Sequence, residues 1–149
     1  LKEVYSNIMI GRIRIEETKE LVVSENRRLI VITEYIYTEK YKGFTSKTIS
    51  LSKENIELFI KESRRVLSGE LILTIIPWGI SPQNELFIQR VKREKDDFKA
   101  KRIDFRQYVN SDNYKGYTKK GLRIPDNVAK KLNIFLEKEI VSSLPPKEL

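Results

Sequence analysis

Histidine and cysteine are both absent from this 149-residue chain. Without cysteine the chain has no disulfide framework and no thiolate metal site. Without histidine it lacks the commonest general base and the commonest protein ligand for transition metals. These two absences argue against most catalytic mechanisms and against a zinc site. We therefore expect a protein that is not an enzyme and that binds no cofactor and no metal.

Long apolar runs are also missing. No stretch approaches the roughly 18 residues of a membrane span, and the N-terminus lacks the organisation of a signal peptide. We expect an intracellular protein with no membrane partner, cytoplasmic or nucleoid-associated if its source is a prokaryote. The hydrophobic content of 40% is still enough to bury a core. The length suits one domain, or two half-size units that share a core.

Acidic residues are in deficit. The chain has 21 Asp and Glu against 29 Lys and Arg, which gives a formal net charge of +8 and a pI near 9.6. A basic balance of this size favours polyanion partners such as nucleic acid, or an anionic membrane surface. The alternative reading of the charge is a soluble protein that is simply rich in lysine.

One stretch of the chain occurs twice. Residues 103–124 (IDFRQYVNSDNYKGYTKKGLRI) align without a gap on residues 30–51 (IVITEYIYTEKYKGFTSKTISL), so that equivalent positions differ by 73 in number. Seven of the 22 pairs are identical: Ile30/Ile103, Tyr35/Tyr108, Tyr41/Tyr114, Lys42/Lys115, Gly43/Gly116, Thr45/Thr118 and Lys47/Lys120. Each copy then runs into a helical pattern. The repeat indicates that one unit of about 70 residues has been used twice.

Hydrophobic periodicity predicts the same order of elements in both halves. In the first half, strands are expected at 7–16, 21–24, 27–37 and 47–51, before a helix that begins near Ser52 and ends at Gly69. In the second half, strands are expected at 71–76, 85–93, 98–109 and 121–124, before a helix that begins at Pro125. Polar loops are expected at 38–45 and 110–120, with turns at 25–26, 81–84 and 94–97.

A single helix cannot cover a four-stranded sheet well, whereas two copies packed helix against helix would bury one continuous core. The sequence therefore predicts an α+β fold. Two tandem β-β-β-β-α units with antiparallel sheets form an intramolecular pseudo-two-fold dimer, with the helices packed together. The first unit is assigned to residues 1–69 and the second to residues 70–141. Residues 142–149, which include two adjacent prolines, are expected to form a flexible tail.

Side chains alternate along a strand, so the third strand of each unit should have a core face and an outer face. In the second unit, Ile103 and Phe105 are expected to face the helix. Arg102, Asp104, Arg106 and Tyr108 are expected to face outward, as are Leu29, Val31, Thr33 and Tyr35 in the first unit. Arg12, Arg14, Arg90, Lys92 and Arg123 could add charge to these faces. The outer face is thus expected to be basic and aromatic in the second unit and more apolar in the first.

The candidate binding residues combine these outer faces with the duplicated loops. In the second unit they are Arg102, Arg106, Tyr108, Tyr114, Lys115, Tyr117, Lys119, Lys120 and Arg123, and in the first unit Tyr35, Tyr41, Lys42, Phe44 and Lys47. Lysine and arginine neutralise phosphates, and aromatic rings stack on unpaired bases with little sequence preference. The combination predicts binding of single-stranded nucleic acid. The simpler explanation is that the tyrosines pack at a sheet edge, the lysines keep a hairpin soluble, and the turn itself requires the shared motif.

The segments EYIYTEKYKGFTSKTISLSKENIELFI and RQYVNSDNYKGYTKKGLRIPDNVAKKLNIFL resemble the strand–loop–strand–helix of the positive-cofactor-four family of transcriptional coactivators. That family has an aromatic-ended strand, a basic glycine-containing loop, a short KGISL-like strand and then a helix. The tandem order also resembles the Pur-alpha repeat proteins, and LVVSENRRLIVITEY is similar to the start of a Pur repeat. Both groups belong with the Whirly proteins, which bind single-stranded DNA or RNA as dimers of this unit.

The resemblance implies binding of single-stranded or unwound nucleic acid, with single-stranded DNA as the first expected partner and RNA as the second. The pathway stays open, because transcription, replication, repair and RNA control would all look alike in the sequence. It places the helices at the dimer interface and nucleic acid on the sheets and loops. The positions that it carries over are Arg102, Arg106, Tyr108, Lys42, Lys47, Lys115, Lys119, Lys120 and Arg123. Two features depart from the pattern: the helices lack the tryptophan often found in the coactivator family, and the outer face of the first unit is less basic.

The main alternative is a protein-interaction or scaffolding module. Leu29, Val31 and Tyr37 could form an exposed apolar sheet face in the first unit, suited to a partner or to further homodimerisation. An enzyme would have to rely on carboxylates, lysine, serine or tyrosine, and the candidate acids Asp96, Asp97 and Asp104 show no convergence on a metal site.

Overall fold

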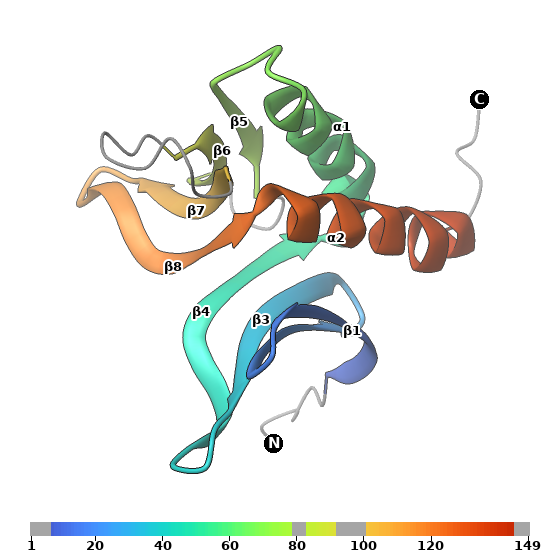
Figure 1. Ribbon diagram of the computed structural model, residues 1–149. Coiled ribbons are helices and arrows are strands. Elements are labelled where there is room, and N and C mark those ends of the chain that lie inside the picture. The colour runs from blue at the N-terminus through green and yellow to red at the C-terminus, as the bar shows by residue number, and fades with distance from the viewer. Residues whose placement is uncertain (1–6, 79–82, 92–100, 145–149) are drawn as a thin grey trace.

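The computed structural model describes residues 7–78, 83–91 and 101–144 and confirms two tandem units, each a four-stranded antiparallel sheet followed by a helix (Figure 1). The first unit consists of β1 (Ile8–Glu16), β2 (Lys19–Glu25), β3 (Leu29–Tyr37), β4 (Lys42–Ser52), a 3₁₀ turn (Lys53–Asn55) and α1 (Ile56–Leu67). The second consists of β5 (Leu73–Pro77), β6 (Asn84–Arg90), β7 (Arg102–Asn110), β8 (Lys115–Pro125), α2 (Asp126–Glu139) and a 3₁₀ turn (Val141–Ser143). In each sheet the strands lie in sequence order.

The sequence repeat is also a structural repeat. Tyr35 pairs with Phe44 between β3 and β4, and the equivalent Tyr108 pairs with Tyr117 between β7 and β8. Both ladders have an irregularity in the same place, just before these tyrosines on the third strand. Equal register and equal irregularity mean that both copies build the same hairpin.

One core serves both units. The predicted inward residues of the third strands, which include Ile32 and Phe105, are fully buried. Phe59 of α1 packs on Phe105 of β7 with ring centroids 5.0 Å apart, so the first helix fills the core beside the second sheet. The buried apolar residues of both sheets and both helices form a single cluster. Neither unit therefore has a separate core.

The helices pack together and reach across the molecule. Besides contacting each other, α1 contacts β5 and β6 of the second sheet, and α2 contacts β1 of the first (Figure 1). Arg64 of α1 donates to Glu137 of α2 at 2.8 Å, and these two residues occupy equivalent positions in the repeat. Gly11 allows the close approach of α2 to β1, because a Cβ atom there would lie 2.5 Å from the ring of Phe135.

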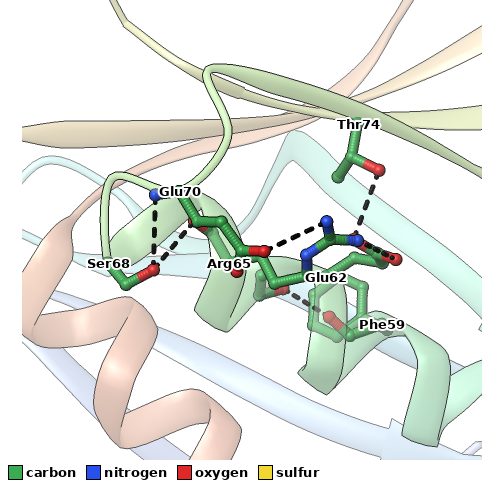
Figure 2. Close-up of polar contacts among 7 residues, drawn as sticks. Phe59, Glu62, Arg65, Ser68, Glu70 and Thr74 are labelled. Carbon is green, nitrogen blue, oxygen red and sulfur yellow. Dashed lines mark hydrogen bonds and ion pairs between the residues drawn. The ribbon is translucent and has the colours of Figure 1, made fainter.

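Polar contacts fix the junction between the units (Figure 2). The carboxylate of Glu62 in α1 accepts from Arg65 at 3.2 Å and from the hydroxyl of Thr74 in β5 at 3.4 Å. Arg65 also pairs with Glu70 at 3.2 Å, and the hydrogen bond to Glu70, with the charge of Glu62, raises the pKa of Arg65 above its ordinary value. The end of α1 is thereby tied to the first strand of the next unit.

Arg90 has a structural role that differs from its predicted place on the outer face. It lies opposite Ile103 in the ladder, on the core side of the sheet. Its guanidinium pairs with Asp126 at 2.6 Å and donates to the carbonyl of Val66 at 3.0 Å. Arg90 therefore joins the last turn of α1 to the first turn of α2, where unpaired carbonyls and a helix-starting carboxylate both favour a cation.

The predicted loops at 38–45 and 110–120 are mostly wrong. The fourth strands begin at Lys42 and Lys115, which pair with Tyr37 and Asn110, so only four residues turn in each hairpin. Glycine and lysine suggested a loop, but pairing with a long third strand outweighs their low strand propensity. The turns predicted at 81–84 and 94–97, residues 98–100 and Lys92 lie partly or wholly outside the described residues.

Candidate nucleic-acid interface

The outer face of the second sheet is the side turned away from the shared core. Along β7, buried Ile103 and Phe105 alternate with residues on this outer face, as predicted. From β5 to β8, the side chains on the outer face include Leu73, Ile75, Phe87, Gln89, Arg102, Asp104, Arg106, Tyr108, Tyr117 and Arg123. The register thus brings five of the predicted site residues, Arg102, Arg106, Tyr108, Tyr117 and Arg123, onto one surface.

Three aromatic rings meet on this face, and we call them the aromatic cluster. The ring centroid of Tyr108 lies 4.8 Å from that of Phe87 and 5.3 Å from that of Tyr117, while Phe87 and Tyr117 are 5.2 Å apart. Tyr117 is 49% exposed. Phe87 is not among the residues predicted from the sequence, although its place between the core residues Leu86 and Ile88 signals an outward side chain.

Beside the aromatic cluster lies a carboxylate that binds two arginines. Asp104 is outward, as expected, but only 2% exposed. One of its oxygens lies 2.9 Å from Arg106 and 3.6 Å from Arg123, and the other accepts from Gln89 at 3.3 Å. A buried carboxylate needs such partners. Asp104 therefore holds both arginines on the face and offsets part of their charge.

A bulge in β8 presents two exposed lysines. Between the pairs Arg106–Gly121 and Tyr108–Tyr117, β7 contributes one residue and β8 contributes Thr118, Lys119 and Lys120. The Thr118 hydroxyl donates to the carbonyl of Gln107 and accepts from the amide of Lys120, both at 3.1 Å. The first unit has the same bond from the amide of Lys47 to Thr45. Bulges bend a strand, and β4 and β8 are both strongly bent in Figure 1.

The loop tyrosines have a structural role in the turns. The hydroxyl of Tyr41 donates to the carbonyl of Phe44 at 2.8 Å, and that of Tyr114 donates to the carbonyl of Tyr117 at 2.9 Å. A Cβ atom on the glycine in between, Gly43 or Gly116, would lie 3.0 Å from the tyrosine oxygen. The turn therefore accounts for the shared tyrosine and glycine, whereas Lys42 and Lys115 are exposed and make no ion pair among the described residues.

The outer face of the first sheet is different. The positions equivalent to Arg102, Arg106 and Arg123 are occupied by Leu29, Thr33 and Ser50. The hydroxyls of Thr33 and Thr48 hydrogen-bond to each other at 2.8 Å. Tyr35 and Phe44 pack edge to face at 5.1 Å, as Tyr108 and Tyr117 do in the second sheet. The aromatic pair is thus shared, but the arginines around it are not.

The edge strands reverse part of this contrast. Arg12 and Arg14 of β1 are exposed, and Arg12 pairs with Glu20 at 3.4 Å. On β5, by contrast, Leu73 and Ile75 are exposed. Exposed aliphatic residues therefore lie on the edge strands of both sheets, since Ile8 and Met9 of β1 are exposed too. Leu29, Val31 and Tyr37, expected to form an exposed apolar face in the first unit, are only partly exposed.

Within the described residues, no group of three or more acidic side chains could hold a metal ion. No described helix is long and apolar enough to cross a membrane.

Comparison with known proteins assigns no family. No family model matches the chain, and no curated protein matches it. A solved structure described as "Crystal structures of trypanosoma bruciei MRP1/MRP2" shares 10% identity, with a TM-score of 0.47, over 94% of this chain and 86% of that one. A likeness at this level assigns neither family nor function.

Proposed function

We propose that this protein binds single-stranded nucleic acid, without catalysis, on the outer face of the second sheet. The observation that carries the proposal is the aromatic cluster of Phe87, Tyr108 and Tyr117, with arginines on its own strands and exposed lysines at the adjoining bulge. Single-stranded DNA is the first ligand to test and RNA the second.

The chemistry of the face suits an unpaired strand. Exposed lysines such as Lys119 and Lys120 can neutralise phosphates and release counterions, which gives affinity that falls steeply with salt. Rings such as Tyr117 can stack on bases, a contact worth about 1–3 kcal/mol per base. Paired bases in a duplex are already stacked on their neighbours, so a ring surface favours the single strand. The resemblance to single-stranded nucleic-acid binders of transcription, replication and repair agrees with this reading.

Fluorescence anisotropy with a labelled mixed-sequence strand of about 20 nucleotides tests the proposal, with the duplex of the same sequence as competitor. We expect the single strand to bind more tightly than the duplex and the affinity to fall between two salt concentrations. A Lys61→Ala variant, which removes one exposed charge from α1, is the control for general loss of charge. No binding at low salt would overturn the proposal.

A protein-interaction role is the second candidate, because Ile72, Leu73 and Ile75 are exposed at the edge strand β5. Apolar residues on an unpaired sheet edge favour a protein contact. Such a contact would depend little on salt, so the same salt comparison separates the two functions.

A further inference from the structure

The guanidinium of Arg106 lies flat on the sheet. A Cβ atom added to Gly121, its cross-strand partner, would lie 2.4 Å from Cζ and 2.6 Å from both Nε and Nη1 of Arg106. If the added Cβ atom lay in the plane of the guanidinium, between Nε and Nη1, it would be closer to these two nitrogens than to Cζ. It is instead closest to Cζ and equally far from both nitrogens, so it lies above the plane. Arg106 therefore presents a face, and not its N–H edge, to Gly121.

Gly121 makes this arrangement possible by leaving space. Its backbone is not in the left-handed region, since the only positive φ values among the described residues belong to Gly43 and Gly69. Any residue could adopt the backbone of Gly121, but a side chain would occupy the place of the guanidinium. The equivalent position in the first sheet is Thr48, whose hydroxyl hydrogen-bonds to that of Thr33, the residue equivalent to Arg106.

The N–H edges of Arg106 are held from two sides. Nη2 donates to Asp104 at 2.9 Å, and Nη1 donates to the carbonyl of Lys119 at 3.3 Å. These contacts fix the orientation of the group in the plane of the sheet. They also make Arg106 a weaker phosphate contact, because a phosphate oxygen would have to compete with a carboxylate that already offsets part of the charge.

The flat guanidinium continues the aromatic cluster. Phe87 is the direct cross-strand partner of Arg106 on β6, and Tyr108 follows it on the same face of β7. Residues at such positions are about 4.5–5.5 Å apart at Cβ for a direct pair and about 7 Å apart along a strand. A planar cation at this place extends the ring surface by one further group.

We propose that Arg106 binds a nucleic-acid base by stacking and does not act as a phosphate contact. The proposal rests on the proposed function and deepens it: the second sheet carries a platform of three rings and one guanidinium. Bases stack on arginine planes as they do on aromatic rings. The lysines at the bulge then neutralise the backbone, so base contact and phosphate contact are divided between neighbouring groups.

Two variants that keep the charge test the proposal. Gly121→Ala places a methyl group where the guanidinium lies and should lift Arg106 off the sheet. Arg106→Lys keeps a cation but removes the plane. Binding is measured to a 20-nucleotide strand and to an abasic strand with the same number of phosphates. We expect both variants to weaken binding to the base-bearing strand about fivefold or more, with little change for the abasic strand.

The comparison variant is Lys119→Ala. It should weaken binding to both strands alike and lower the salt slope by about 0.7, the value for one phosphate contact on a single strand. Arg106→Lys and Gly121→Ala should leave that slope unchanged. Thr48→Ala, at the equivalent position of the first sheet, should change neither quantity. Thermal unfolding of each variant confirms that it is folded.

If Gly121→Ala and Arg106→Lys both bind the base-bearing strand with wild-type affinity at both salt concentrations, Arg106 is not a stacking group. Equal losses on the base-bearing and abasic strands would identify Arg106 as a phosphate contact. Failure of the wild-type protein to bind any single strand is a separate result, which overturns the proposed function itself.

Discussion

The two sheets have the same ladder but different outer faces. Tyr35 and Tyr108 occupy the same place, each packed on an aromatic residue of the fourth strand. Around them, the aliphatic and hydroxyl side chains of the first sheet are replaced in the second by arginines and an aspartate. The equivalent pairs are Leu29/Arg102, Val31/Asp104, Thr33/Arg106 and Ser50/Arg123. At these positions on the third and fourth strands, the second copy of the unit therefore has charged residues where the first has none.

This difference changes how the internal repeat should be interpreted. The shared Tyr41/Tyr114 and Gly43/Gly116 are explained by bonds that close the two turns. The arginines of the second sheet replace aliphatic and hydroxyl residues on an outer face, where no core packing constrains them. Identity at the turns therefore marks what the hairpin requires, and the charged replacements on the outer face mark the candidate function.

The largest effect is expected when the second sheet is given the outer face of the first. The changes Arg102→Leu, Asp104→Val, Arg106→Thr and Arg123→Ser copy the equivalent residues and avoid leaving Asp104 as an unpaired buried charge. We expect affinity for the single strand to fall about 100-fold or more, since stacking and charge are both lost. Anisotropy titration measures it. Unchanged affinity would show that the first sheet or another surface binds.

A smaller effect is expected when a single ring is removed from the second sheet, with removal of the equivalent ring from the first sheet as the control. Tyr108→Ala takes away the ring that contacts both Phe87 and Tyr117, and should cost about 1–3 kcal/mol of binding free energy. Tyr35→Ala, the matched control, removes an equivalent ring with no arginines around it and should have little effect. Equal losses for the two variants would contradict the asymmetry and favour binding on both sheets.

The helices also differ at the equivalent core positions 60 and 133, and here the measured quantity is stability. Asn133 of α2 is 1% exposed, and neither polar atom of its side chain has a hydrogen-bond partner among the described residues. The equivalent residue of α1 is the buried Ile60. Because leucine has a shape close to that of asparagine, Asn133→Leu should raise the free energy of unfolding by roughly 1–3 kcal/mol. Urea denaturation tests this, and Ile60→Asn should destabilise in the reciprocal experiment.

The smallest effect is expected at the ion pair between the helices. The hydrogen bond and the charge of Arg64 lower the pKa of Glu137 below its ordinary value. A carboxyl group with a lowered folded pKa stabilises the fold above its unfolded pKa, near 4.3, and this contribution is lost as the pH falls through the folded pKa. Glu137→Gln should therefore be slightly less stable than the wild type at pH 7 and equal to it at low pH. A difference that persists at low pH would point to packing and not to charge.

Much of the fold could be predicted from the sequence, and the errors have physical causes. Strand alternation was sufficient to place Ile103 and Phe105 in the core and Tyr108 outside it. The length of β4 and β8 was missed, because glycine and lysine have low strand propensity and the pairing that extends these strands comes from β3 and β7. Arg90 was misplaced for a similar reason: its partners come from both helices, far away in the sequence.

By itself, the sequence determined the two tandem units, which residues of the third strands face the core, and the arginines and tyrosine that β7 places on the candidate face, since these depend on local periodicity and on the repeat. The tertiary structure decided which residues act together. Only cross-strand register brings Phe87 to the tyrosines, sets Asp104 between two arginines and lays Arg106 over the space left by Gly121. Such contacts join strands that are separated along the chain, so local sequence patterns do not contain them.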